Sequence, residues 1–171
     1  MELKTIPILS PEFAQRRAVR LAASHPEIWD LLDGVYDPEL PGLTIWDLGV
    51  LQDVRMVDGV CEVDITLTYS GCPAVDAMTK DIKKVLNDSG YEKIDVKVVL
   101  SPVWSTAMMS PEGKAHLKQI NIAPPSEKDE ICCPQCESSK VHVISQFGST
   151  ACKALYQCND CHETFDYFKH F

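Results

Sequence analysis

Two Cys-x-x-Cys motifs near the end of the chain carry the clearest chemistry in the sequence. They are Cys133-Pro134-Gln135-Cys136 and Cys158-Asn159-Asp160-Cys161, with 21 residues between them. Four thiolates at about this spacing are typical of a tetrahedral structural zinc site, and a segment this short buries too little apolar surface to fold without such support. We therefore predict a zinc ion bound by Cys133, Cys136, Cys158 and Cys161. Iron in the same thiolates, or disulfides in an oxidising compartment, are the alternatives.

The segment between the two motifs is expected to form a β-hairpin, with strands over residues 141–146 and 154–157. Cys132 and Cys152 are left over from the four-ligand set. Cys152 lies beside Lys153 in a loop, and we leave open whether it is functional or a small buried residue. His162 and His170 are interpreted as surface residues, because four thiolates already fill a zinc ion.

A separate cysteine, Cys72, lies between a predicted strand and a predicted helix. Apolar residues alternate from Val60 to Tyr69, as in a half-buried strand, and follow helical spacing from Pro73 to about Ser89. Pro73 suits the first helical position, which makes Cys72 the predicted N-cap. Backbone N–H groups and the helix dipole would favour the thiolate there, the form that binds metals. The alternative is a small buried cap residue.

Three acidic residues could join this cysteine. Asp37 and Glu39 lie in a loop whose prolines and glycine exclude a helix, and Asp47 lies in the following turn. The loop before the first strand and the loop after the second should lie at the same end of the sheet. Asp37, Glu39, Asp47 and Cys72 could therefore converge and hold a transient iron ion. Alternatively, Asp37 and Asp47 cap their own turns.

The composition excludes several classes of protein. A formal net charge of -9 argues against nucleic-acid binding, because affinity for phosphate comes mainly from Lys and Arg. No apolar run approaches the ~20 residues that span a bilayer. The first residues lack the layout of a signal peptide. We therefore expect a cytoplasmic protein with neither nucleic-acid nor membrane partners, whose cysteines bind metal or take part in catalysis.

The predicted elements run helix, helix, strand, strand, helix, strand, helix. They occupy about residues 11–23, 26–35, 50–57, 60–69, 73–89, 93–100 and 110–120, with Arg16, Arg17 and Arg20 exposed on the first helix. This order predicts an α/β (α+β) fold, with a small mixed sheet covered by helices and followed by a four-cysteine zinc-ribbon β domain. The predicted organisation is an extension over 1–24, an α/β domain over 25–123, a linker over 124–131 and the ribbon over 132–171.

Several of these segments are also similar to known motifs. They are Asp37-Pro38-Glu39-Leu40-Pro41, Ile45-x-Asp47-Leu48-Gly49, Thr66-x-Thr68-Tyr69-Ser70-Gly71-Cys72-Pro73 and Leu100-Ser101-Pro102-x-Trp104. Over roughly residues 28–122, the chain resembles the iron–sulfur-assembly domain of Suf-associated and cytosolic iron–sulfur targeting proteins. The tail, with Phe147-Gly148-Ser149-Thr150 and Cys152-Lys153-Ala154-Leu155-Tyr156 beside the two Cys-x-x-Cys motifs, resembles the PaaD (PaaJ) family.

The resemblance implies an accessory protein of bacterial phenylacetate degradation and not an enzyme. Such a protein would assist maturation or insertion of an iron–sulfur or iron centre in the multicomponent phenylacetyl-CoA epoxidase. Cys72 matches the family's cysteine. The implied partners are epoxidase subunits, above all the iron–sulfur reductase component, and the iron–sulfur assembly machinery. A non-catalytic scaffold subunit of the epoxidase is the alternative, and a thiol redox enzyme ranks last because Cys72 has no Cys-x-x-Cys partner. The first 24 residues or so match no pattern.

Overall fold

The structure, a computed structural model, describes residues 9–69, 71–126 and 130–169, so Ser70 and parts of the predicted extension and linker lie outside it. Its helices are α1 (Pro11–Leu21), α2 (Pro26–Leu32), α3 (Val75–Asp88) and α4 (Pro111–Gln119), with a 3-10 turn, η1 (Thr106–Met108), before α4. Its strands are β1 (Leu51–Val57), β2 (Val60–Ile65), β3 (Ile94–Val98), β4 (Ile122–Ala123), β5 (Val141–Ser145), β6 (Lys153–Cys158) and β7 (Thr164–Phe168). None of the helices in these ranges is long and apolar enough to cross a membrane.

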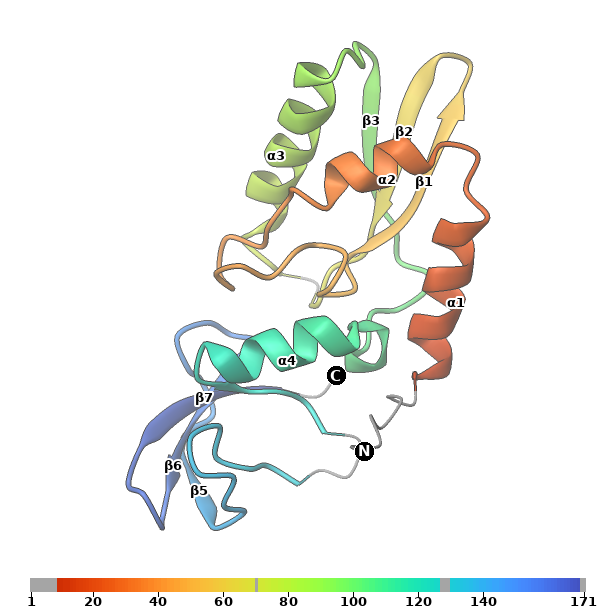
Figure 1. Ribbon diagram of the computed structural model, residues 1–171. Helices are drawn as coiled ribbons and strands as arrows, with labels where there is room; N and C mark the ends of the chain where they lie inside the picture. The colour runs from red at the N-terminus through yellow and green to blue at the C-terminus, as the bar shows by residue number, and fades with distance from the viewer. Residues whose placement is uncertain (1–8, 70, 127–129, 170–171) are drawn as a thin grey trace.

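Strands β1, β2 and β3 form the first sheet in that order, with β1 antiparallel and β3 parallel to β2. Asp58 and Gly59 join β1 to β2 with φ of 49° and 78°, the positive values of a type I′ turn. A parallel pair needs a crossover connection, and α3 supplies it between β2 and β3 (Figure 1). The small mixed sheet that the sequence predicts is therefore confirmed.

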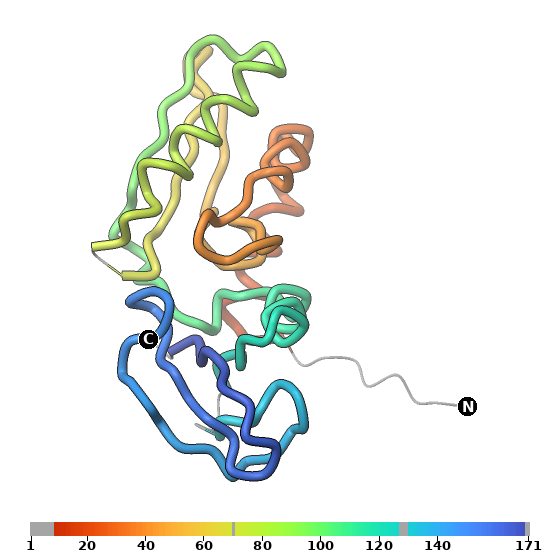
Figure 2. The backbone as a smooth tube through the Cα atoms, turned by 90° about the vertical axis from the view of Figure 1, so that its left-hand side faces the viewer, coloured from red at the N-terminus to blue at the C-terminus, as the bar shows by residue number. Residues whose placement is uncertain are grey.

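One face of this sheet is apolar and the other is charged. Val63 and Ile65 of β2 are completely buried, as are Ile82 and Leu86 of α3. On the opposite face, Arg55 forms ion pairs with two acidic side chains of β2. The period-two alternation of β2 thus separates a core face from a solvent face. Helices α2 and α3 complete the core side (Figure 2).

Strand β2 is shorter than predicted, because it ends at Ile65 and not at Tyr69. A strand continues only while a neighbouring strand pairs with it. Both neighbours stop at this point, since β1 begins at Leu51 and β3 ends at Val98. The residues that follow β2 therefore form a loop in front of α3.

The predicted N-cap of α3 is also wrong. The helix begins at Val75 and its N-cap is Ala74, two residues beyond Cys72. The Cys72 N–H instead donates to the Tyr69 oxygen at 3.2 Å, which closes a turn before the helix. Pro73 lies in the next turn, closed by the Val75 N–H and the Cys72 oxygen at 3.5 Å, and not at the first helical position. Cys72 is therefore a turn residue next to a helix start.

Helix α1 begins after its N-cap Ser10, as predicted, but Arg16 is buried and not exposed. Its guanidinium donates to backbone oxygens of Trp46, Leu51 and Met108, and its Cζ lies 4.3 Å from the centroid of the Trp46 ring. Three carbonyl groups compensate for the burial of this charge, and a periodicity argument cannot anticipate such long-range partners. These bonds fix α1 to the rest of the N-terminal half.

The C-terminal half forms a second sheet, in the order β4-β7-β6-β5. The predicted hairpin is confirmed as antiparallel strands β5 and β6, and β7 adds a strand beyond those expected from the sequence. Strand β4, which precedes the predicted linker, pairs in parallel with β7. The chain therefore enters this sheet before the proline-rich segment begins.

The two halves share a core. The main cluster of buried side chains extends from α2, α3 and the first sheet to Cys152 and Phe168 of the second sheet region. The Phe168 ring lies 6.0 Å from the Trp104 ring, centroid to centroid. A smaller cluster around Phe165 and Tyr167 belongs to the C-terminal sheet alone. Helix α4 lies between the two sheets (Figure 1).

Candidate functional site

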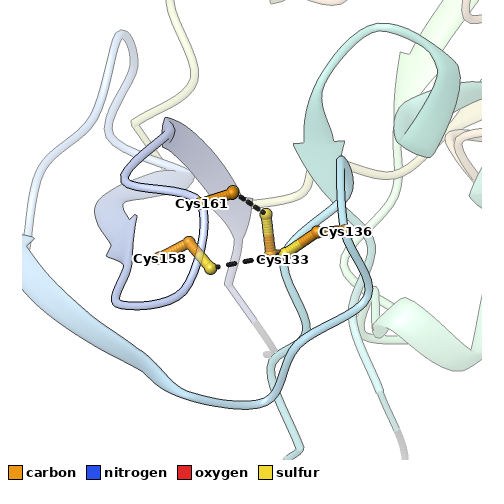
Figure 3. Close-up of side chains that lie close together, drawn as sticks. All are labelled: Cys133, Cys136, Cys158 and Cys161. Carbon is orange, nitrogen blue, oxygen red and sulfur yellow. Dashed lines mark hydrogen bonds between the residues drawn. The ribbon is translucent and has the colours of Figure 1, made fainter.

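The four predicted zinc ligands come together in the C-terminal half. The sulfurs of Cys133, Cys136, Cys158 and Cys161 all lie within 4.8 Å of one another. Figure 3 shows the two pairs that face each other across the cluster, with sulfur–sulfur distances of 3.7 Å for Cys133 and Cys161 and 3.5 Å for Cys136 and Cys158. Four thiols in one shell match the ligand number and type of a structural zinc site.

The two turns that carry these thiols have the same backbone geometry. Four residues after the first cysteine of each motif, Glu137 and His162 have φ of 62° and 63°, and their N–H groups bond to the oxygens of Cys133 and Cys158. In one facing pair, burial and the neighbouring thiols raise the pKa of Cys136 despite a backbone hydrogen bond from Ser138, while backbone N–H groups of Cys161 and Asp160 lower the pKa of Cys158 to about 7. A lowered thiol pKa favours the thiolate that a metal requires.

Within the residues that the structure describes, no other group of three or more Cys, His, Asp or Glu side chains has its ligand atoms close enough to hold a metal ion. The predicted iron-binding set around Cys72 is therefore not assembled as a complete metal site. The C-terminal half therefore contains a preformed four-thiol site, whereas the N-terminal half contains only a partial set of ligands.

Cys72 is only 8% exposed and belongs to the main core. Burial raises the pKa of its thiol, although a hydrogen bond from the Ala74 N–H acts in the opposite direction, and the charges of Glu39 and Asp37 raise the pKa further. The prediction of a thiolate is therefore wrong for the protein without bound metal. The side chain is held as a neutral thiol.

The charges of Asp37 and Glu39, two of the residues predicted to join Cys72, reach this thiol and raise its pKa. The Glu39 N–H donates to Asp37 Oδ1 at 2.8 Å, so Asp37 also caps its own turn. Burial raises the pKa of Asp37, while this hydrogen bond and the positive charge of Lys153 lower it. The structure thus gathers Asp37, Glu39 and Cys72 at one end of the sheet.

Asp47 is not part of this group. Its two carboxylate oxygens accept hydrogen bonds from Thr44 Oγ1 at 2.8 Å and Ser110 Oγ at 2.6 Å. Its backbone oxygen also accepts from the Ser110 N–H at 2.9 Å. Asp47 therefore ties the turn before β1 to the N-terminus of α4, which is a capping role and not a metal-binding one.

Two residues from the C-terminal half approach the Cys72 end and were not assigned from sequence. Cys152 is 4% exposed, and its charge acts on the pKa of Cys72. Lys153 is 3% exposed and donates to the Glu39 backbone oxygen at 3.5 Å. The sequence signal for them was a cysteine followed by a lysine at the start of a strand, but their neighbours lie far earlier in the chain.

Comparison with known proteins agrees with this two-part architecture. Residues 26–99 match the family described as iron-sulfur cluster assembly protein, and residues 118–169 match the PaaD zinc beta ribbon domain. A crystal structure of a domain of unknown function, DUF59, from Bacillus anthracis is 33% identical to this chain. The match covers 61% of this chain and 95% of the DUF59 chain, with a TM-score of 0.50.

Two curated relatives differ in how much of the chain they match. The Staphylococcus aureus (strain USA300) protein named "Fe-S protein maturation auxiliary factor SufT" is 41% identical over 85 residues, which are 48% of this chain and 96% of that protein. An Escherichia coli (strain K12) protein, named as one of the subunits of a "Putative 1,2-phenylacetyl-CoA epoxidase", is 41% identical over 161 residues, 88% of this chain and 98% of that protein. The chain therefore belongs to the PaaD family, in which an iron–sulfur cluster assembly domain is followed by a zinc β-ribbon.

Proposed function

We propose that this protein is a non-catalytic accessory factor of bacterial phenylacetate degradation that helps to mature or insert an iron–sulfur or iron centre in the multicomponent phenylacetyl-CoA epoxidase. The observation that carries the proposal is the position of Cys72. This thiol lies at the end of the first sheet, where the charges of Asp37 and Glu39 act on it, within the region that matches the iron–sulfur cluster assembly family. The names of the relatives support both the maturation role and its connection with the epoxidase.

The chemistry of the Cys72 region suits a transient ligand better than a permanent one. A permanent site needs a full set of ligands in place, as in the four-thiol cluster. Cys72 has carboxylates nearby, but the described ligand atoms around it do not form a closed shell. A carrier must also release its cargo, and an incomplete shell lets thiols of the client protein take the remaining positions on iron.

The four-thiol cluster has a different role in this proposal. Cys133, Cys136, Cys158 and Cys161 would hold zinc, whose chemistry there is structural, since all four positions would be filled by protein. The small apolar cluster of the ribbon contains two of these cysteines and few other side chains. Zinc would therefore stabilise the ribbon, and the ribbon in turn packs its Phe168 against the N-terminal half.

Replacement of Cys72 in cells that depend on this protein for growth on phenylacetate tests the proposal. Cys72→Ser should lower the cluster content of the epoxidase reductase and the epoxidase activity, whereas Cys132→Ser, at an exposed cysteine, should leave both unchanged. Zinc content and the urea midpoint of each purified variant verify folding. Normal cluster content with Cys72→Ser, together with loss of epoxidase activity on deletion of the whole protein, would favour the scaffold role instead.

A further inference from the structure

The connection between β5 and β6 reaches from the ribbon to the end of the N-terminal half where β2 leads into α3. Figures 1 and 2 both show this loop next to that end of the first sheet. The loop ends at Cys152, and Lys153 begins β6, where it pairs with Phe168, whose ring packs against Trp104. The ribbon therefore brings a second thiol into the region of Cys72.

Direct contacts support this arrangement. Lys153 Nζ donates to the Glu39 backbone oxygen at 3.5 Å, which joins the ribbon to the loop of Asp37 and Glu39. The Cys152 sulfur lies 3.0 Å from Thr150 Oγ1, so a neighbouring hydroxyl orients it. Cys72 and Cys152 are 8% and 4% exposed and belong to the same cluster of buried residues.

The electrostatics indicate that these groups act on one another. Burial is the main reason why the pKa of both thiols is raised, and each pKa is raised further by Asp37 and Glu39. The charge of Cys152 also raises the pKa of Cys72, while Lys153 lowers the pKa of Cys152. Two buried thiols beside two carboxylates are poorly suited to ionise alone, but a bound cationic centre would stabilise both thiolates.

We propose that Cys72 and Cys152 form a two-thiol site that binds an iron–sulfur cluster between the two halves of the chain. This inference rests on the proposed function and adds the second ligand to it. On binding, each sulfur forms one bond to iron in place of one ligand of the donor, and each thiol releases its proton to the departing ligand or to solvent, with no electron transferred. On delivery, thiols of the client replace the two sulfurs and lose protons, and Cys72 and Cys152 are protonated again.

A cavity lies at the junction of the two halves, next to the β5–β6 connection. Glu39 and Lys153 line a cavity of about 550 Å³ between the loop of Asp37 and the ribbon. Phe147, on the β5–β6 connection, also lines it and is 69% exposed. Its lining includes Lys153, next to Cys152, so an open cavity with an exposed aromatic at its edge gives a client protein a surface to bind beside the Cys152 segment.

Anaerobic reconstitution tests the pair directly. The zinc-loaded full-length protein and its Cys72→Ser, Cys152→Ser and Cys132→Ser variants are incubated with ferric iron, sulfide and a thiol reductant and then desalted. We expect iron and acid-labile sulfide on the wild type and on Cys132→Ser. We expect less than a tenth of that amount on either of the other two variants, with zinc content unchanged and a single cooperative urea transition retained. The visible circular dichroism of the bound cluster provides a second readout.

The outcomes separate this inference from the proposed function. If Cys152→Ser retains the wild-type cluster and Cys72→Ser loses it, the two-thiol site is refuted and the maturation role of Cys72 stands. If Cys72→Ser also retains it, or the wild type binds none, both proposals fail.

A second measurement does not depend on the folding of variants. Diamide oxidises two neighbouring thiols to a disulfide, with loss of two hydrogen atoms from the protein, and is itself reduced to a hydrazine. Mild treatment of the zinc-loaded protein should give a Cys72–Cys152 disulfide by peptide mapping. If both cysteines stay reduced, or Cys72 pairs with another cysteine, the proposed geometry is overturned.

Discussion

Replacing Phe168 should loosen the attachment of the ribbon to the N-terminal half. Phe168 is completely buried at the end of β7, and its ring meets Trp104 at an interplanar angle of 63°. Phe→Ala changes in a core cost about 3–5 kcal/mol, of which the aromatic pair supplies about 0.5–1.5 kcal/mol. We expect Phe168→Ala to lower the free energy of unfolding by about 3–5 kcal/mol. Phe147→Ala, the same change at a 69% exposed ring, should cost less than about 1 kcal/mol.

Urea unfolding followed by tryptophan fluorescence measures this loss, because Trp104, one of the three tryptophans of the chain, lies at the junction. The same variant should retain its zinc, since Phe168 lies outside the four-thiol cluster, but should bind less iron–sulfur cluster, since Cys152 would no longer be held in place. A loss below about 1 kcal/mol, or equal losses for both phenylalanines, would show that Phe168 does not anchor the ribbon.

Three further predictions address individual contacts. Arg16→Met should lower the free energy of unfolding in urea by about 3 kcal/mol or more, because three backbone oxygens lose a buried donor. The same change at the exposed Arg17 should lower it by less than about 0.5 kcal/mol. Gly49→Ala should lower the free energy of unfolding by roughly 2–4 kcal/mol in the same assay, because the φ of Gly49 is +87° and an added Cβ would lie 2.9 Å from the Met108 side chain. Gly59→Ala, with φ of +78° but open space around it, should cost only about 1 kcal/mol. The alkylation rate of Cys72, followed by mass spectrometry, should rise with pH with a midpoint above the ordinary thiol value of 9.0, because a raised pKa keeps the thiol protonated there, and exposed Cys132 should react several times faster at about pH 8. Equal costs within either variant pair, or equal rates for the two thiols, would contradict these assignments.

Local sequence patterns predict the elements of this fold well. The alternation along β2, the Asp58-Gly59 turn and the Ser-Pro starts of α1 and α4 each depend on residues close in the chain. The predictions fail where residues far away in the chain determine the end of a strand or the burial of a side chain. Strand β2 stops because its neighbours stop, and Arg16 is buried because three carbonyl groups from other segments meet at its guanidinium.

The candidate sites divide in the same way. Two Cys-x-x-Cys turns bring four thiols together through local geometry and one hairpin, so spacing alone predicts the cluster. The surroundings of Cys72 depend on tertiary packing, which removes Asp47 to a capping role and adds Cys152. The ionisation of Cys72 differs from the prediction for a related reason, because burial outweighs the nearby helix start.

The positions of the four-thiol ribbon and the Cys72 region suggest why the two domains occur in one chain. A relative named as a maturation factor is covered over 96% of its own length by a match to only 48% of this chain, so that relative has no room for both domains. In this chain the ribbon places Cys152 and Lys153 beside the Cys72 region. A metal-stabilised ribbon can hold a loop rigidly with few buried residues of its own. The position of the second thiol then depends on the ribbon being folded, and the proposed cargo site would be complete only in chains that carry zinc.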